Sequence, residues 1–413
     1  MLDLKFIREN VELVKKNCQD RRVIVDLDRL VVLDDERREM MQQIEVLRAE
    51  RNQKSTSKPS EEEMARLKSV GDVISQKEQE LEKVQEKLVA LWMQIPNLTH
   101  PQTPIGSEED FKTVFESPKP TFPFETKDHE TLMNNLNVID FERGAKVAGA
   151  KFYFTKGDLV RLNFALLQYG MDVLATYGYE LVETPDLAKT EILTGTGYNP
   201  RGDAQDQIYT IENTDLSLIA TAEITMGGYH QDEVLDLSKG PKKYAAISHC
   251  FRKEAGAYGR TSKGLYRVHQ FTKLEMFIYC KPEESEAMHQ ELLSIEREIC
   301  DGLEIPYRVI DIASSDLGGP AYRKYDIEAW MTMLDNWGEI TSTSNCTDYQ
   351  ARRLKIRYKD EEGKTQLVHT LNGTAVVLSR FPIALFENHQ QADGSIAIPK
   401  VLQKYLGKEF IGK

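Results

Sequence analysis

A seven-residue repeat near the start of the chain restricts the fold more than any other feature of the sequence. Between residues 67 and 95, apolar side chains recur at heptad spacing, and most of the intermediate positions are apolar as well. The repeating positions are Leu67, Ile74, Leu81, Leu88 and Ile95, with Val70, Val84 and Leu91 between them and Lys77 as an interruption. This spacing predicts the seam of a coiled coil.

The preceding stretch repeats the same period, which predicts a second helix. Its seam positions are Leu30, Leu33, Met40, Ile44 and Leu47, with Arg37 and Arg51 at two of the expected apolar places. The break between the stretches, KSTSKPSEEE at 54–63, contains Pro59, and Ser60 before three glutamates suits a helix N-cap. Helices at about 27–54 and 60–95 would form an antiparallel hairpin on the order of 45 to 50 Å long. Such a hairpin is either a dimerisation coiled coil or an exposed arm that contacts another molecule.

The change in composition after the coiled coil predicts two domains, at 1–100 and 101–413. Residues 1–18 add a short amphipathic helix, and the proline-containing run PNLTHPQTPIG after Ile95 forms the linker. In the second domain, strands are expected at 179–185, 243–252, 268–279, 305–313, 323–330, 337–344 and 366–371, and helices at 157–179 and 282–302. Strands in groups, with helices between the groups, predict an α+β fold around an antiparallel sheet.

Composition excludes several classes of protein. The 413 residues are 40% hydrophobic and 29% charged, and they contain no apolar run of about 18 residues that could span a membrane. The N-terminus, MLDLKFIREN, is charged from its third residue and is not a secretory signal. The five cysteines form no CxxC pair, so we expect neither disulfides nor zinc, and a cytoplasmic location.

The net charge of −13 argues against indiscriminate binding of nucleic acid. The charge is unevenly distributed, because eight basic residues stand against six glutamates between Arg37 and Lys68. The charge of the arm is therefore compatible with binding one RNA of defined shape, and such binding should weaken steeply with salt.

The segment 249–277 carries the most chemistry, although the sequence has no GxxxxGK[ST] phosphate loop. Arg252 and Glu254 end one expected strand, and a Gly-rich basic loop follows with Gly256, Gly259, Arg260, Lys263 and Gly264. Alternation then places five side chains on one face of the returning strand: Arg267, His269, Phe271, Lys273 and Glu275.

This hairpin can hold a nucleoside triphosphate without a phosphate loop. Arg252 would clamp the α-phosphate, Phe271 would stack on adenine, and Glu254 would accept a hydrogen bond from the adenine amino group. The alternative is a surface hairpin whose charges pair across the strands.

Two further segments would complete such a site. The run HTLNGTAVVLSRFPIALFENHQ at 369–390 is expected to form an apolar amphipathic helix with small residues and Arg380 at its start. Facing a nucleotide, Arg380 would be a second phosphate clamp, whereas elsewhere it would only extend its charge to solvent. Glu339 and Ser342 could serve a Mg²⁺ ion that bridges phosphates, or they could simply end a polar strand.

Several blocks of the sequence resemble the signature motifs of class II aminoacyl-tRNA synthetases, and their details resemble the seryl-tRNA synthetase family. The matching blocks are CFRKEAGAYGR, GLYRVHQFTKLEM, TAE, SNCTDYQARR, LNGTAVVLSR and the N-terminal LDLKFIREN. YGYELVETPDL, with Pro185, resembles motif 1 of the class, its dimer-interface element. The resemblance covers essentially the whole chain. It implies a catalytic antiparallel sheet flanked by helices, preceded by an antiparallel coiled-coil arm.

The same resemblance assigns site residues. The implied ATP contacts are Arg252, Lys253, Glu254, Val268, His269, Gln270, Phe271, Glu339, Ile340, Thr341, Ser342 and Arg380. The implied serine contacts are Thr221, Ala222, Glu223, Arg252, Glu275 and Thr374. Arg252 and Arg380 would be catalytic, and Glu339 and Ser342 would hold Mg²⁺.

By this resemblance the chain is expected to be a serine–tRNA ligase. It would activate L-serine with ATP to seryl-adenylate and transfer the seryl group to tRNA(Ser), which the coiled-coil arm would contact. The expected assembly is a homodimer that does not contact a membrane. Charging of tRNA(Sec) is left open.

Two departures from the family pattern concern the expected serine pocket. Motif 3 commonly reads LNGSGLAVGR, whereas here Thr374 replaces Ser and Ser379 replaces Gly before the arginine; LIATAE also replaces LIPTAE. Three other classes compete: a carrier-protein aminoacyl ligase, which should lack the arm; an inactive paralogue, which should lack the motif arginines or glutamates; and a purely structural coiled-coil protein.

Overall fold

A computed structural model describes residues 1–52, 60–198, 207–254 and 263–412. The chain divides into two compact units, Met1–Leu98 and Thr99–Lys413. Part of the expected break at 54–63 lies outside the described residues. The expected loop residues Gly256, Gly259 and Arg260 lie outside them entirely.

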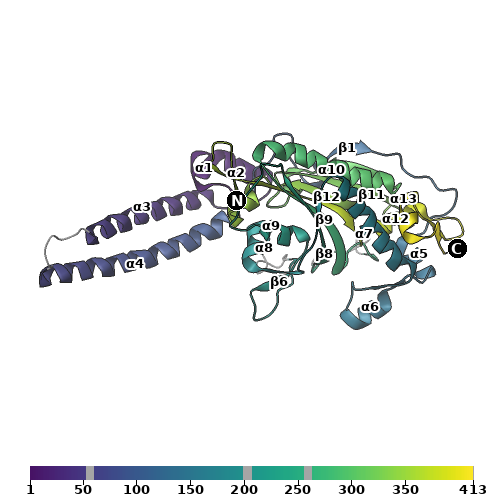
Figure 1. Ribbon diagram of the computed structural model, residues 1–413, viewed down its shortest axis with the longest axis horizontal. Coiled ribbons are helices and arrows are strands. Elements are labelled where there is room, and N and C mark those ends of the chain that lie inside the picture. The colour runs from purple at the N-terminus through teal and green to yellow at the C-terminus, as the bar shows by residue number, and fades with distance from the viewer. Residues whose placement is uncertain (53–59, 199–206, 255–262, 413) are drawn as a thin grey trace. The chain divides into compact units, whose positions relative to one another are not determined.

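The first unit consists of helices. They are α1 (Leu4–Glu9), α2 (Val11–Asp20), α3 (Leu27–Arg51) and α4 (Glu61–Trp92). The long helices α3 and α4 pack along each other in Figure 1, and the Ser60 hydroxyl caps α4 by accepting a hydrogen bond from Glu63 N–H, as expected. The expected single helix at 1–18 is wrong in one respect, because a non-helical Asn10 divides it into α1 and α2.

The seam between α3 and α4 follows the heptad pattern. Its fully buried members are Leu30, Leu33, Ile44, Ile74 and Leu88. Two of the three polar interruptions have partners in the seam region: Arg37 pairs with the buried carboxylate of Asp34 at 2.6 Å, and Lys77 Nζ donates to Gln43 Oε1 at 2.7 Å. Arg8 of α1 binds the same Asp34 carboxylate, so this ion pair ties the short helix to α3.

The second unit is built on an eight-stranded sheet. In spatial order its strands are β1 (Lys112–Glu116), β10 (Tyr307–Asp311), β11 (Arg323–Met331), β12 (Asn336–Asn345), β15 (His369–Val377), β9 (Gln270–Cys280), β8 (Lys242–Phe251) and β4 (Glu180–Glu183). Every neighbouring pair is antiparallel except β4 with β8. The predicted α+β class is therefore confirmed.

Helices cover both faces of this sheet. One hydrophobic cluster joins β9 residues Met276 and Ile278 to α7 (Asp158–Thr176), α10 (Ser285–Gly302) and α12 (Phe381–His389). A second cluster joins the alternate residues Phe277 and Tyr279 to α9 (Ala222–Gly228) and α11 (Tyr349–Leu354). The sheet is thus the middle layer, and Figure 1 shows helices beside it.

The remaining elements are short and complete the second unit. They are η1 (Glu108–Asp110), α5 (His129–Asn135), β2 (Ile139–Asp140), α6 (Phe141–Ala148), β3 (Phe154–Thr155), β5 (Leu187–Lys189), α8 (Thr190–Thr196), β6 (Leu216–Leu218), β7 (Val234–Leu235), η3 (Pro282–Glu284), η4 (Ser314–Asp316), β13 (Arg357–Lys359), β14 (Thr365–Leu367), β16 (Ile396–Ala397), α13 (Lys400–Leu406) and β17 (Phe410–Ile411). Among the helices that the structure describes, none is long and apolar enough to cross a membrane.

The region around 369–390 differs from the prediction. Its first half is the strand β15, which is buried between β9 and β12, and helix α12 begins only after Arg380. A strand that is buried on both faces shows a continuous apolar run rather than alternation, so it cannot be told from a buried helix by period alone.

Candidate active site

A polar cavity of about 220 Å³ lies over the middle of the large sheet, lined by residues of β9, β12 and β15. Strands β12 and β15 pair only from Thr343–Gly373 to Asn345–Leu371 and then separate. Both strands also change register at this point, β12 at Ile340 and β15 at Ala375. The cavity lies where the two strands separate, and it draws its side chains from segments far apart in the sequence.

Two arginines line the cavity. The guanidinium of Arg252 lies over the ring of Phe271 at 5.3 Å and donates to Ala220 O at 3.3 Å. Arg380, just before α12, stacks on the ring of Tyr266 at 3.9 Å and donates to Tyr266 O at 2.7 Å. Each arginine is therefore held by an aromatic ring and a backbone carbonyl, which leaves guanidinium charge available to an anion.

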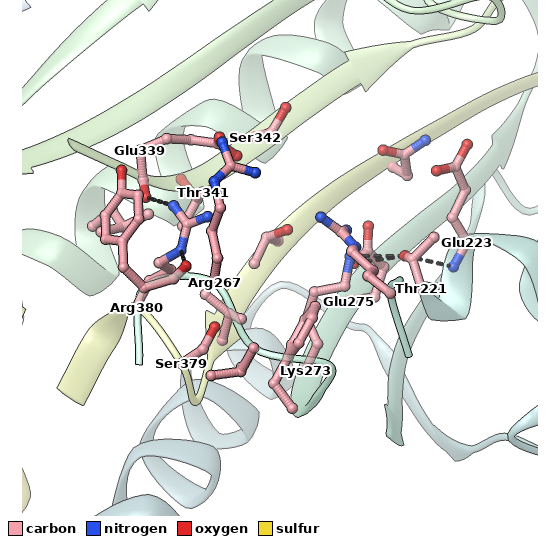
Figure 2. Close-up of a pocket in the computed structure, with 18 of the residues that line it drawn as sticks. Thr221, Glu223, Arg267, Lys273, Glu275, Glu339, Thr341, Ser342, Ser379 and Arg380 are labelled. Carbon is pink, nitrogen blue, oxygen red and sulfur yellow. Dashed lines mark hydrogen bonds and ion pairs between the residues drawn. The ribbon is translucent and has the colours of Figure 1, made fainter. Parts of the chain in front are cut away.

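Glu339 lies beside Arg380, as Figure 2 shows. Its backbone carbonyl accepts a hydrogen bond from Arg380 Nη1 at 2.6 Å, and its side chain opens into the cavity. The surrounding protein displaces water and by itself raises the pKa of Glu339, but Arg380, Lys324 and Arg252 together hold that pKa below its usual range. The carboxylate is therefore ionised at neutral pH.

Ser342 and Asp326 lie beside each other as a cross-strand pair of β12 and β11. Burial raises the pKa of Asp326 to about 7, although Lys324 and the Ser342 hydroxyl oppose the shift. With Glu339, these side chains offer the oxygen donors that Mg²⁺ takes. Within the described residues, no group of three or more His, Cys, Asp or Glu side chains could hold a metal ion on its own. A Mg²⁺ ion would therefore need further oxygen ligands, from phosphates or water.

Carboxylates also line the cavity, on the right in Figure 2. Glu275 of β9 forms an ion pair with Lys273, whose Nζ also donates to Thr221 Oγ1 at 2.7 Å. Thr221 caps α9, and its hydroxyl accepts a hydrogen bond from Glu223 N–H at 3.2 Å. Thr374 of β15 stands directly opposite Glu275 in the sheet.

Glu223 is held by neutral donors. Tyr198 Oη donates to one carboxylate oxygen at 3.2 Å, and Gln350 Nε2 donates to the other at 2.7 Å. Burial, with the nearby charge of Glu275, raises the pKa of Glu223 to about 7. Burial also raises the pKa of Glu275, and Lys273 opposes this shift. Such a group of carboxylates is suited to binding a ligand ammonium group.

Most of the site residues implied by the sequence line this one cavity. Those that do are Thr221, Glu223, Arg252, Glu254, Val268, Phe271, Glu275, Glu339, Ile340, Thr341, Ser342, Thr374 and Arg380. Glu254 is paired there with Arg267 at 3.2 Å.

Four of the implied residues do not line the cavity. Ala222 is fully buried in α9, and Gln270 is exposed at the start of β9. His269 precedes β9, so alternation does not place it on the cavity face; its ring instead hydrogen-bonds Arg252 O at 2.9 Å. Lys253 N–H donates to Gln207 O at 3.0 Å.

The cavity also holds residues to which the sequence analysis gave no role. Lys273 and Arg267 were placed on the correct strand face but without a function, and their alternation with Phe271 was the available signal. Tyr266 and Tyr198 had no such signal, because loops carry them into the cavity.

The sheet, its two arginines and the facing carboxylates define the catalytic core of a class II aminoacyl-tRNA synthetase. Residues 208–389 match the tRNA synthetase class II core domain (G, H, P, S and T). Residues 1–99 match the seryl-tRNA synthetase N-terminal domain.

Full-length relatives identify the family within this class. The chain is 52% identical to the serine–tRNA ligase of Rubrobacter xylanophilus over 100% of this chain and 99% of the relative. It is 51% identical to that of Treponema denticola, with 100% of each chain covered. The chain belongs to the seryl-tRNA synthetase family and is an aminoacyl-tRNA ligase.

A solved structure agrees with this assignment. The crystal structure of seryl-tRNA synthetase from Pyrococcus horikoshii complexed with ATP matches with a TM-score of 0.90 and 38% identity, covering 100% of this chain and 99% of the other. The predicted family, catalytic domain and coiled-coil arm are therefore confirmed.

Proposed function

We propose that the cavity binds ATP on the side of Arg252 and Arg380 and L-serine on the side of Glu223 and Glu275. The observation that carries this proposal is that two anchored arginines and a group of buried carboxylates line one cavity. The arginines suit the phosphates of ATP, and the carboxylates suit the ammonium group of an amino acid.

The chemistry that follows is adenylation. The serine carboxylate attacks the α-phosphorus of ATP, a P–O bond forms, and the bond to the bridging oxygen of pyrophosphate breaks. Arg252 stabilises charge at the α-phosphate and Arg380 stabilises the leaving pyrophosphate, so catalysis rests on positioning and electrostatics rather than on a side-chain nucleophile. When bound at Glu339 and Ser342, Mg²⁺ would neutralise phosphate charge. The terminal ribose hydroxyl of tRNA then takes the seryl group from the adenylate.

Serine would be selected by polar groups that need its hydroxyl. Glu275 and Thr374 face each other across β9 and β15, and both are buried. Alanine lacks the hydroxyl and would leave these groups without a partner, which weakens its binding strongly. The methyl group of Thr374 reduces the space available for threonine.

The test is amino-acid-dependent ATP–pyrophosphate exchange with serine, threonine, alanine and glycine. We expect exchange with serine alone, and absence of serine-dependent exchange would overturn the assignment. Arg252→Ala should lower the exchange rate by about 10²- to 10³-fold, as the loss of one charge-stabilising group does elsewhere. Exposed Lys68 on α4 gives the control, since Lys68→Ala should leave exchange unchanged.

For the helical arm we propose contact with the backbone and shape of tRNA(Ser), because duplex RNA hides its base edges in a deep major groove. The locally basic stretch between Arg37 and Lys68 supports this role. A chain lacking residues 30–93 should keep serine-dependent exchange but lose aminoacylation of tRNA. Loss of both activities would instead assign the arm to folding.

We also propose a cytoplasmic homodimer. Exposed apolar side chains near the motif 1 segment support self-association, namely Phe154, Phe164, Leu181 and Leu187. Phe164 also lines a partly apolar cavity of about 400 Å³, together with Ile247. Fractionation of cells would test the location, and tRNA(Sec) can be tried as a second substrate in the charging assay.

A further inference from the structure

The point where β12 and β15 separate leaves polar groups inside the protein. Beyond the Thr343–Gly373 pair, neither strand satisfies the other's backbone groups. The segments beyond that point are functional: β12 carries Glu339 to Ser342, and β15 carries Thr374. Something must hold the two strands at a fixed separation, because an open gap in a sheet would otherwise close or move.

Glu296 of α10 lies under this gap, on the opposite face of the sheet from the cavity. Its side chain is fully buried, and Oε2 accepts a hydrogen bond from Thr341 Oγ1 of β12 at 3.1 Å. The backbone N–H of Thr374 in β15 lies close enough to lower the pKa of this carboxyl group, although Oε1 has no hydrogen-bond partner among the described residues. Gly373 leaves room for the side chain, since a Cβ there would lie 3.2 Å from Glu296 Oε1. One carboxyl group thus touches both strands where they separate.

The protonation state of the Glu296 carboxyl group follows from its surroundings. Burial raises the pKa of Glu296 well above its usual range, and nearby Asp326 and Glu275 raise it further, whereas Thr341 opposes the shift. A neutral carboxyl group can still accept the Thr341 hydrogen bond through its carbonyl oxygen, and it adds no negative charge beneath a site that must bind phosphates.

We propose that Glu296 is a positioning residue that sets the distance between the ATP segment of β12 and the serine contact Thr374 of β15. This inference rests on the proposed function, because it assigns substrates to the two strands. It also explains why the hydroxyl of Thr341 points to Glu296, although Thr341 lines the cavity.

The first test compares two substitutions of Glu296. Glu296→Leu removes both polar contacts, and we expect kcat/KM for adenylation to fall by about 10- to 100-fold, mainly through higher KM for ATP and serine. Glu296→Gln keeps an amide donor and acceptor of the same size, so KM should stay within about twofold of the parent. If the Gln variant is as impaired as the Leu variant, the neutral bridge is wrong.

The matched control is Leu292→Ala, one turn earlier on the same buried face of α10. It should lower Tm but leave both KM values unchanged, because Leu292 touches core rather than the gap. If Glu296→Leu behaves in the same way, with lower Tm and unchanged KM, then Glu296 is structural and the proposal is overturned.

A double-mutant cycle tests the route of the effect. Thr341→Val removes only the hydroxyl partner and should raise the KM for ATP more than that for serine, and adding it to Glu296→Leu should have little further effect. Fully additive effects would overturn the bridge. Failure of the parent enzyme to exchange with serine would instead count against the proposed function alone.

Discussion

At the scale of single residues, the two carboxylates on the serine side of the cavity have different partners. Glu275 is next to Lys273, whereas Glu223 is held by the neutral donors Tyr198 and Gln350. Burial and the charge of Glu275 raise the pKa of Glu223 to about 7, although Lys273 opposes the shift, and this value lies inside the working range of an enzyme. The binding of a cationic ligand group should therefore depend on pH.

Serine binding should strengthen as pH rises through about 7. Below that pH Glu223 is protonated and attracts an ammonium group only weakly; above it the carboxylate is ionised, so the KM for serine should fall with rising pH. The measurement is the serine KM in exchange assays from pH 6 to 8.5. Glu223→Gln should raise KM by about 10- to 100-fold and remove this pH dependence, because one charged hydrogen bond is lost.

Asp326 also has a pKa of about 7, so it titrates in the same pH range as Glu223. Measuring the KM for ATP together with the KM for serine separates the two titrations, because Asp326 lies beside the expected ATP segment. In the Glu223→Gln variant the pH profile for ATP should be unchanged. A pH step in serine KM that survives this substitution would show that Glu223 is not the titrating group.

A buried histidine holds the end of the segment that carries Tyr266. His129 Nδ1 pairs with Glu387 of α12 at 2.8 Å, and its Nε2 accepts a hydrogen bond from Leu265 N–H at 3.2 Å. Both side chains are fully buried, and Arg380 at the start of α12 binds Tyr266 O. Replacing His129 would disturb both elements that hold Arg380.

His129→Ala should lower the free energy of unfolding by about 3 kcal/mol, since it leaves buried polar partners unsatisfied, and should raise the KM for ATP. Urea unfolding and exchange assays measure the two effects. Lys263→Ala is the control, because the Lys263–Asp128 pair is partly exposed and should contribute less than about 1 kcal/mol. An unchanged KM for ATP in His129→Ala would contradict this role.

At the scale of elements, the helices of the arm and most strands followed from periodicity. The heptad positions predicted which face of α4 is buried, and even the polar Lys77 and Arg37 lie at the seam, where Gln43 and Asp34 bind them. Strand β15 was only partly predicted, because burial on both faces removes the alternation that marks a strand.

Strand alternation also predicted part of the candidate site, but it could not predict the residues that lie outside a regular pattern. Phe271 and Glu275 alternate along one strand, so the sequence alone places them together. Glu296 could not be found, because its role depends on a gap between two strands whose pairing is not visible in the sequence.

The ion pairs of Asp34 should determine how α1 is held against α3. Asp34→Ala would leave Arg8 and Arg37 without this buried partner and should destabilise the first unit by about 1 to 3 kcal/mol. Thermal unfolding followed by circular dichroism measures the change. Asp35→Ala, at an exposed position that pairs with exposed Arg38, should have almost no effect. Equal effects of the two substitutions would contradict a special role for Asp34.

At the scale of the whole molecule, the edge of the large sheet at β4 is the surface that we propose for contact with a second subunit. Leu181 of β4 and Phe164 of α7 are exposed, and contiguous exposed apolar residues of this kind mark interaction sites. The edge of β4 that does not pair with β8 has no partner strand within the described part of the chain.

If this surface forms the proposed dimer, Phe164→Ser should convert the dimer into a monomer, because Phe164 is 69% exposed on it and serine would remove its apolar contact area. Sedimentation equilibrium measures the change. Val147→Ser is the matched control, since Val147 is equally exposed, at 72%, but does not line the apolar cavity. Sedimentation of the parent as a monomer would contradict the proposed dimer.

The position of β15 in the sheet also determines the order in which the enzyme becomes competent during its synthesis. This strand is almost the last part of the second unit to be made, yet it lies between β9 and β12 and joins the two halves of the sheet. Until it has left the ribosome, the arginine of motif 3 and Thr374 are absent and the halves cannot join. A growing chain therefore binds neither substrate productively until it has passed residue 380, and serine activation begins only after that point.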